Sequence, residues 1–149
     1  MPKNIVDAYK KALNKLERAD FQNVVSFCEN DEECREDTSL KKNVLMFWSY
    51  KKIAIFYEKN KKYKQAYMFW QKAFDFANSS DAKIRTGHKM LDVVNKMKIT
   101  MREKAEEIVR IANSMKREYE LQGNKESISR MLKLQAVAEK ILKKSKYLH

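Results

Sequence analysis

The chain has 149 residues, which is enough for one ordinary domain with a single packed core. It contains only two glycines and one proline, and because tight β-turns normally draw on these residues, the composition excludes a sheet-rich fold and predicts an all-α one. The hydrophobic fraction of 44% can supply a core, and the formal net charge of +12 indicates long-range attraction to acidic partners without specifying one.

The N-terminal third predicts two apolar helices and an acidic loop. Apolar residues recur at spacings of three and four from about residue 4 to about residue 18, and a shorter apolar segment follows Asp20. The positions expected to face a core are Ile5, Ala8, Tyr9, Ala12, Leu13 and Leu16 in the first helix and Phe21, Val24, Val25, Phe27 and Cys28 in the second. Residues 29–37 then hold six acidic side chains against Arg35 alone, which predicts a solvated loop.

Cys28 and Cys34 are the only two cysteines. Six residues apart on one continuous helix they would point to different sides, so a disulfide would require residues 29–33 to form a loop. We expect two free thiols, the usual state of cysteines in the cytoplasm. No CxxC pair or neighbouring histidine supports a metal site, so we expect no metal ion and no cofactor.

The middle of the chain predicts a helical hairpin. A third helix should begin at a cap on Thr38 or Ser39 and run to about Lys59, and a fourth should run from Tyr63 to Ala77 after the polar break at residues 60–62. The third helix is apolar over more than one face, which is typical of a helix at the centre of a fold.

Three more helices are predicted before the C-terminus. A fifth follows residues 78–81, Thr100 and Glu103 form a capping-box pattern at the start of a sixth, and Gly123 followed by Asn124 indicates its end and the start of a seventh. The expected inward positions are Ile84, Met90, Leu91, Val94 and Met97, then Ala105, Ile108, Ala112, Met115 and Tyr119, then Ile128, Met131, Leu132, Val137, Ala138, Ile141 and Leu142. We therefore expect a single all-helical domain over residues 1–149 with about seven helices, the last two forming a long hairpin over residues 100–146.

Residues 47–80 carry a pattern of large and small side chains that resembles one tetratricopeptide repeat. The matching positions are Tyr50, Ile53, Ala54 and Tyr57 on the first helix of the hairpin and Ala66, Trp70 and Ala73 on the second. Two antiparallel helices approach closely only where small side chains face each other, so Ala54 opposite Ala66 should be the contact point. The departures are Asn78, where many repeats have proline, and poor matches in the preceding and following registers, so the resemblance covers less than a quarter of the chain.

The resemblance implies a helical adaptor or scaffold, built either as an α-solenoid or as a compact bundle. In that family the ligand is usually held by residues of the first helix, which here would be Trp48, Lys51, Ile55, Glu58 and Lys59. Lys51 and Lys59 fall where peptide-binding members place cations for a carboxylate. The expected partner is therefore another protein or an acidic peptide, although both lysines could instead be solvated surface residues.

A nucleic acid is the alternative partner. Aromatic residues at positions 57, 63 and 67 interleave with cations, and cations beside stacking rings suit a single-stranded backbone and its bases. The basic patch expected on this reading comprises Lys52, Lys61, Lys62, Lys64 and Lys72. Against it, most of these rings have a place in the packing of the hairpin, and lysine outnumbers the arginine that reads bases. Self-association into a homo-oligomer is a further alternative that the sequence leaves open.

Catalysis and membrane insertion have little support. His88, the only internal histidine, has no cysteine or aspartate at a spacing that would orient it, and none of the phosphate-loop, zinc-protease or nucleophile-elbow motifs occurs, so we expect no enzyme. No apolar run approaches the roughly 18 residues that a transmembrane helix requires. The first residues pass directly into charged positions such as Asp7 and Lys10, so we expect no signal peptide and a soluble, cytoplasmic protein.

Overall fold

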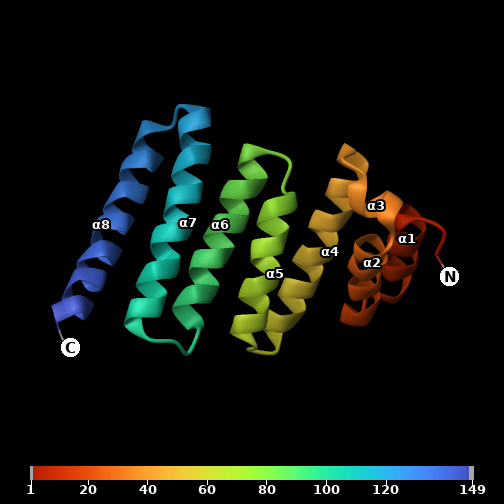
Figure 1. Ribbon diagram of the computed structural model, residues 1–149, viewed down its shortest axis with the longest axis horizontal. Coiled ribbons are helices and arrows are strands. Elements are labelled where there is room, and N and C mark those ends of the chain that lie inside the picture. Colours follow the sequence, from red (N-terminus) through yellow and green to blue (C-terminus); the bar gives the residue numbers. More distant parts are fainter. Residues whose placement is uncertain (1, 148–149) are drawn as a thin grey trace. The chain divides into compact units, whose positions relative to one another are not determined.

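The computed structural model describes the backbone of residues 2–147 and the side chains of residues 2–144. This part of the chain forms eight α-helices and no strand, which confirms the predicted all-α fold (Figure 1). The helices are α1 Ile5–Lys15, α2 Arg18–Asn30, α3 Glu32–Glu36, α4 Leu40–Lys59, α5 Tyr63–Phe76, α6 Ser80–Lys96, α7 Met101–Gln122 and α8 Lys125–Tyr147. They fall into two compact units, one extending to Asn78 and the other beginning at Ser79.

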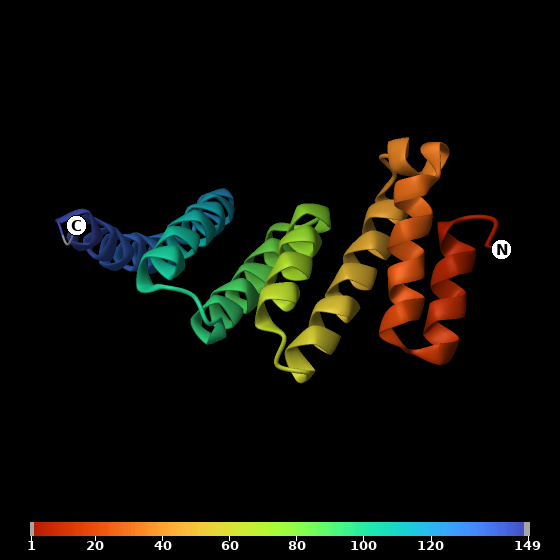
Figure 2. The same cartoon turned by 60° about the horizontal axis from the view of Figure 1, so that its bottom comes forward.

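Helix α4 is the centre of the first unit. It packs against α1, α2 and α5, and it lies between α2 and α5 in both Figure 1 and Figure 2. The largest side chains without exposed surface in this unit come from three of its helices: Phe21, Val24, Met46, Ile53 and Trp70. The apolar character of α4 over more than one face, visible in the sequence, is thus explained by neighbours on several sides.

The α4–α5 hairpin has the packing expected from its small residues. Ala54, Ala66 and Ala73 have no exposed surface, as a close approach of two helices at these positions requires. The indole N–H of the buried Trp70 donates a hydrogen bond to the carboxylate of Glu58, so the one polar atom of this ring is satisfied inside the hairpin.

The first helix is shorter than predicted. It ends at Lys15, and Leu16 adopts a left-handed conformation with φ 56° that turns the chain toward α2. Leu13 and Leu16 are 43% and 57% exposed, so their predicted place in the core is wrong. The backbone reversal takes Leu16 out of the packed face, whereas Leu13 lies within α1, beside the face formed by Ile5, Ala8 and Ala12.

The acidic segment is not a plain loop, and the expectation of free thiols is wrong. Helix α2 ends at Asn30, Asp31 is extended and caps α3 by accepting a hydrogen bond from the Cys34 N–H, and α3 supplies the eighth helix. This reversal brings the Cα atoms of Cys28 and Cys34 to 5.0 Å, where the two residues form a disulfide. The sequence showed that a bridge needed a break between the cysteines, and the break lies at Asp31.

Of the two predicted caps of α4, Thr38 and Ser39, the structure uses Ser39, whose hydroxyl accepts a hydrogen bond from the Lys42 N–H at 3.3 Å. The backbone N–H and the hydroxyl of Ser39 also donate to the Asp37 carboxylate, at 2.9 and 3.0 Å. These two hydrogen bonds hold the pKa of Asp37 below its usual value because they stabilise the ionised form. The same two hydrogen bonds hold the backbone in one conformation between α3 and α4.

Helix α7 is the centre of the second unit and packs against both α6 and α8. The predicted caps are confirmed: Thr100 accepts from the Glu103 N–H, Gly123 is left-handed with φ 67°, and Asn124 accepts from the Ser127 N–H. The predicted long hairpin of two helices is also present, since α7 has 22 residues and α8 has 23.

Helix α8 buries a narrower face than predicted. Its buried positions are Ser127, Met131, Gln135 and Ala138, and the Gln135 amide donates to the Asn113 side chain of α7 at 2.9 Å. Leu132 and Val137 are exposed, so their predicted inward positions are wrong. A helix packed along a single partner buries a stripe spaced by three and four residues, and these two side chains flank that stripe on opposite sides.

No helix in the described part of the chain is both long and apolar enough to cross a membrane.

Candidate partner-binding site

The predicted groove residues lie mostly on the outward face of α4. Trp48 is 42% exposed, and the Lys51 ammonium lies 4.9 Å from the centroid of its ring. Ile55 is half-buried and Lys59 is exposed, and the spacing of three, four and four residues places all four on one side of the helix. Glu58 differs from them because its carboxylate accepts the indole hydrogen bond of Trp70 within the hairpin.

The predicted basic patch does not form one cluster. Lys61 and Lys62 lie at the turn between α4 and α5, Lys64 is exposed in the first turn of α5, and Lys52 is half-buried on α4. Lys72 lies eight residues beyond Lys64, roughly 12 Å further along the helix at 1.5 Å per residue. Lys52, seven residues before the end of α4, and Lys72 therefore both lie away from the three lysines at and just after the turn.

The aromatic residues expected to stack on bases are partly occupied. Tyr67 is buried, and Tyr57 is stacked on Phe69 with ring centroids 5.5 Å apart and an interplanar angle of 12°. Tyr63 is half-buried. Less ring surface is thus left for a nucleic acid than the sequence suggested.

Lys72 belongs to a different arrangement, a row of rings and cations where α4 meets α2 and α5, which we call the cation–ring ladder. Ring contacts follow the order Tyr57, Phe69, Tyr50, Phe76, with centroid distances of 5.5, 6.2 and 5.6 Å. Cations lie over these rings: Arg18 at 5.0 Å from Tyr57, Lys72 at 5.7 Å from Phe69 and 5.6 Å from Tyr50, and Lys42 at 5.5 Å from Phe76. Cation–π attraction keeps these charged groups close to the aromatic surface.

A pocket of about 300 Å³ lies at the α3 end of the ladder. Its lining residues are Cys28, Glu29, Arg35, Lys42, Met46, Tyr50, Lys72, Asp75 and Phe76. Cys28, Lys42, Met46 and Tyr50 are buried and form its base, whereas Arg35, Lys72 and the two carboxylates are exposed at its rim. The disulfide fixes part of the wall, because Cys28 lines the pocket and its partner Cys34 holds α3 in place.

Tyr50 is a fixed hydrogen-bond donor in this pocket. Its hydroxyl donates to the Glu29 carboxylate at 2.7 Å. Burial raises the pKa of Tyr50 far above its usual value, and the neighbouring Glu29 carboxylate raises it further. The phenol therefore stays protonated throughout the physiological range and occupies one oxygen of Glu29.

The ladder and the predicted groove lie on nearly opposite sides of α4. Successive residues of an α-helix are rotated by about 100°, so Trp48 and Tyr50 point roughly 160° apart. The sequence predicted the side of α4 that carries Trp48, and it did not single out Lys42, Arg35, Phe69 or Phe76 as site residues. The spacing of Lys42, Met46 and Tyr50 by four, and of Phe69, Lys72 and Phe76 by three and four, was the available signal for the second side.

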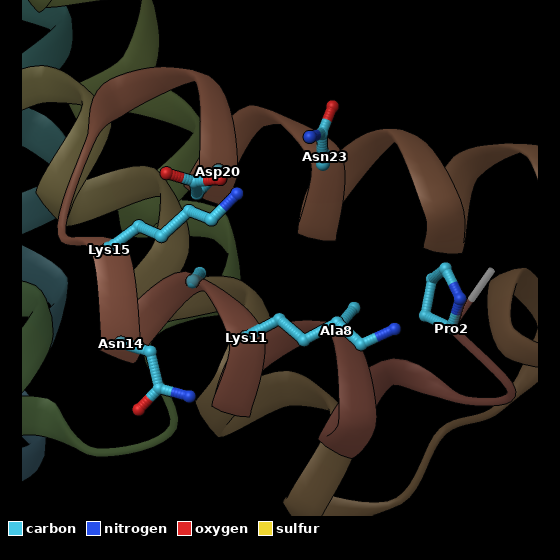
Figure 3. Close-up of a pocket in the computed structure, with 8 residues that line it drawn as sticks. Pro2, Ala8, Lys11, Asn14, Lys15, Asp20 and Asn23 are labelled. Atoms are coloured by element: carbon cyan, nitrogen blue, oxygen red, sulfur yellow. The ribbon is translucent and has the colours of Figure 1, made fainter.

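A second pocket, of about 310 Å³, lies between α1 and α2 (Figure 3). Figure 3 shows Lys15 extending toward Asp20 across it, although no ion pair joins the two. One carboxylate oxygen of Asp20 is buried without a hydrogen-bond partner. Because the rest of Asp20 is only half-buried, the pocket lacks the enclosed polar group of a built binding site.

Neither a metal centre nor a known relative adds to this description. Among residues whose side chains are described, no three His, Cys, Asp or Glu gather closely enough to hold a metal ion. His88 Nε2 lies 3.1 Å from the Tyr119 hydroxyl, a contact that ties α6 to α7.

Comparison of the chain with protein families, curated proteins and solved structures finds no match.

Proposed function

We propose that this chain is a non-enzymatic protein-interaction module, a tetratricopeptide-like adaptor that binds an acidic segment of another protein on the outward face of α4. The observation that carries the proposal is Trp48, a large aromatic side chain 42% exposed with the Lys51 ammonium over its ring. Tryptophan is among the residues that contribute most to binding energy at protein interfaces, and a surface Trp in a row with Ile55 offers an apolar anchor.

The charges around Trp48 favour an acidic partner. Lys51 and Lys59 lie eight residues apart on the same face, so their Cα atoms are roughly 12 Å apart along the axis. Two carboxylates of a short segment can reach both ammonium groups as charge-assisted hydrogen bonds. Residues 40–78 carry nine Lys and Arg against two Asp and Glu, so the whole hairpin attracts such a segment at long range.

The family resemblance supports an adaptor role through packing. Ala54, Ala66 and Ala73 are buried without exposed surface, Ile53 and Trp70 fill the core beside them, and α4 and α5 form the antiparallel pair that one repeat requires. Because such a hairpin is rigid, its first helix loses little conformational entropy when a ligand binds to it.

The experiment uses the full chain and fluorescein-labelled peptides of eight residues, one rich in Asp and Glu and one with the matching Asn and Gln. Binding is followed by anisotropy and by Trp48 emission, which should report the contact because the other tryptophan, Trp70, is buried. We expect the acidic peptide alone to bind, and Trp48→Ala and the pair Lys51→Glu and Lys59→Glu each to weaken it at least tenfold. Lys125→Glu with Lys133→Glu makes the same charge change at the same spacing on α8, outside the hairpin, and serves as the matched control.

A single-stranded oligonucleotide in the same assay tests the alternative partner. Binding to it with a steep salt dependence, together with no affinity for the acidic peptide, would replace the protein-binding proposal by a nucleic-acid one. Equal peptide binding by the wild type and the Lys51 and Lys59 double variant would remove the assignment to this face of α4.

A further inference from the structure

The pocket beside α3 contains cations that form no ion pair with a described carboxylate. Lys42 is only 7% exposed, and its ammonium makes one hydrogen bond, to the Arg35 carbonyl oxygen at 3.3 Å, besides its contact with the Phe76 ring. None of the ion pairs among the described side chains involves Arg35, Lys42 or Lys72. An ammonium group has three donors, and within the described part of the chain a protein acceptor is found for one of those of Lys42.

A largely buried cation that forms no ion pair loses part of the water that would otherwise solvate it, and this desolvation is costly. The Asp37 carboxylate attracts Lys42 at a distance too long for an ion pair. The Phe76 ring and one carbonyl oxygen offset part of this cost. The remaining donors of Lys42 lie in a pocket whose rim carries two further cations, Arg35 and Lys72. Three positive groups therefore line this small space, where they can attract a negative group.

The carboxylates at the rim decide how much negative charge the pocket accepts. One oxygen of Glu29 accepts the hydrogen bond from Tyr50. Asp75 lies at the rim, three residues after Lys72 in the sequence. With three cationic and two anionic side chains, the lining has a net charge of about one positive unit. A monoanion matches this balance better than a phosphate dianion, which the two carboxylates would repel.

The apolar part of the lining describes the rest of the ligand. Met46, Phe76 and the ring of Tyr50 form one side of the space, and a volume of about 300 Å³ holds a group the size of one aromatic ring with room to orient. We propose that this pocket is a binding site for a carboxylate carried on a flat or apolar body, with the carboxylate between Lys42 and Lys72 and the body against Met46 and Phe76. This site is distinct from the α4 face on which the proposed function depends.

The carboxylate can belong to a small free acid or to the C-terminus of a polypeptide. Benzoate represents the first source and acetyl-phenylalanine with a free carboxylate the second, and benzamide and acetyl-phenylalanine amide are their neutral counterparts. The full ¹⁵N-labelled chain is titrated with each, and backbone amide shifts are followed by NMR. We expect saturable shifts at Met46, Tyr50 and Phe76 with at least one acid, and at least tenfold weaker binding of its amide.

Variants connect the binding to the pocket. Lys42→Met shortens the side chain by one atom and removes its charge; because replacing a buried charge by an apolar group is often neutral or stabilising, this variant should fold. It should weaken carboxylate binding at least tenfold, and Lys72→Gln should weaken it severalfold. Lys64→Gln on the same helix as Lys72 should leave binding unchanged, and so should Lys51→Glu with Lys59→Glu, which separates this site from the proposed peptide face.

The relative affinity of the two acids assigns the source of the carboxylate. Tighter binding of benzoate identifies a small-molecule site, and tighter binding of acetyl-phenylalanine identifies a site for a chain terminus. Equal affinity for an acid and its amide overturns the proposal, as do unchanged binding in both Lys42→Met and Lys72→Gln or shifts that do not saturate at the pocket.

Discussion

Gly87 on α6 lies directly against the side chain of Met115 on α7: a Cβ atom built on Gly87 would be 2.6 Å from the Met115 Cγ and 2.8 Å from its Sδ. Both residues are buried, and Met115 has no exposed surface. The missing side chain at residue 87 therefore sets how closely these two helices pack. Because the Cγ is near the backbone of α7, the methionine cannot avoid an added methyl group by moving only its far end.

Gly87→Ala should destabilise the second unit. The clash costs about 1–3 kcal/mol, as overpacking usually does, and is offset by about 1 kcal/mol from the better helix propensity of alanine. Urea denaturation followed by circular dichroism measures the difference. Met115→Ala provides the control: in the double variant the cavity accepts the new methyl group, so the two losses should be less than additive. Additive losses would show that the two side chains do not contact each other.

The disulfide between Cys28 and Cys34 should stabilise the first unit by about 2 kcal/mol, the chain-entropy value for a loop of this length. The double variant Cys28→Ala and Cys34→Ala avoids burying hydroxyl groups and should lose that amount in urea denaturation. Its α3 should exchange amide hydrogens faster, because the bond is a main attachment of this five-residue helix.

Thiol labelling provides an independent check. The purified chain should show no reactive thiol before reduction and two after it. Reduction should lower the free energy of unfolding of the wild type but not that of the double variant. The cytosol keeps most cysteines reduced, so the same labelling in cells also tests the predicted cytoplasmic location. Two reactive thiols in the purified, unreduced chain would contradict the bond.

The fold was predictable where local signals and tertiary packing agree. Ser39, Thr100, Gly123 and Asn124 each carry a cap whose hydrogen bond or left-handed backbone is formed within one turn, so the sequence located these helix ends. At Leu16 the chain reverses without a glycine or proline, and nothing in the sequence distinguishes this position, so the length of α1 was missed. Asp31 is a favoured N-cap residue, but the five-residue α3 that it caps is too short to show an apolar periodicity, so this helix was missed.

The candidate site was predictable only in part because α4 presents more than one face to its surroundings. The periodicity of α4 identified which residues lie together on each side, and this was enough to align Trp48, Lys51, Ile55 and Lys59. It could not show that Lys42 and Lys72, 30 residues apart in sequence, line one pocket, since that depends on how α5 returns along α4. The role of Glu58 as acceptor for Trp70 depends on the same tertiary geometry.

The Glu58–Trp70 hydrogen bond should be worth more than a surface contact. Glu58→Ala leaves the indole N–H of a fully buried ring without a partner, and an unsatisfied buried donor costs about 1–3 kcal/mol. Glu58→Gln retains an acceptor oxygen and should lose less than half as much. Urea denaturation of the three proteins gives both values, and a Gln variant as unstable as the Ala variant would show that charge, not acceptance of this hydrogen bond, is what matters at residue 58.

Tyr50 should make the first unit sensitive to alkali. Its folded pKa lies above the ordinary value of 10.0, so above pH 10 the folded chain keeps a proton that the unfolded chain has lost. Unfolding then releases a proton, and the stabilisation present below pH 10 is lost as pH rises toward the folded pKa, by at most about 1.4 kcal/mol per pH unit. Lysines also titrate in this range, so the control is Tyr50→Phe, which lacks the phenol and keeps the ring. The free energy of unfolding of the wild type should fall more steeply between pH 9 and pH 11.5 than that of the variant, and parallel curves would show that Tyr50 ionises as freely in the folded chain as in the unfolded one.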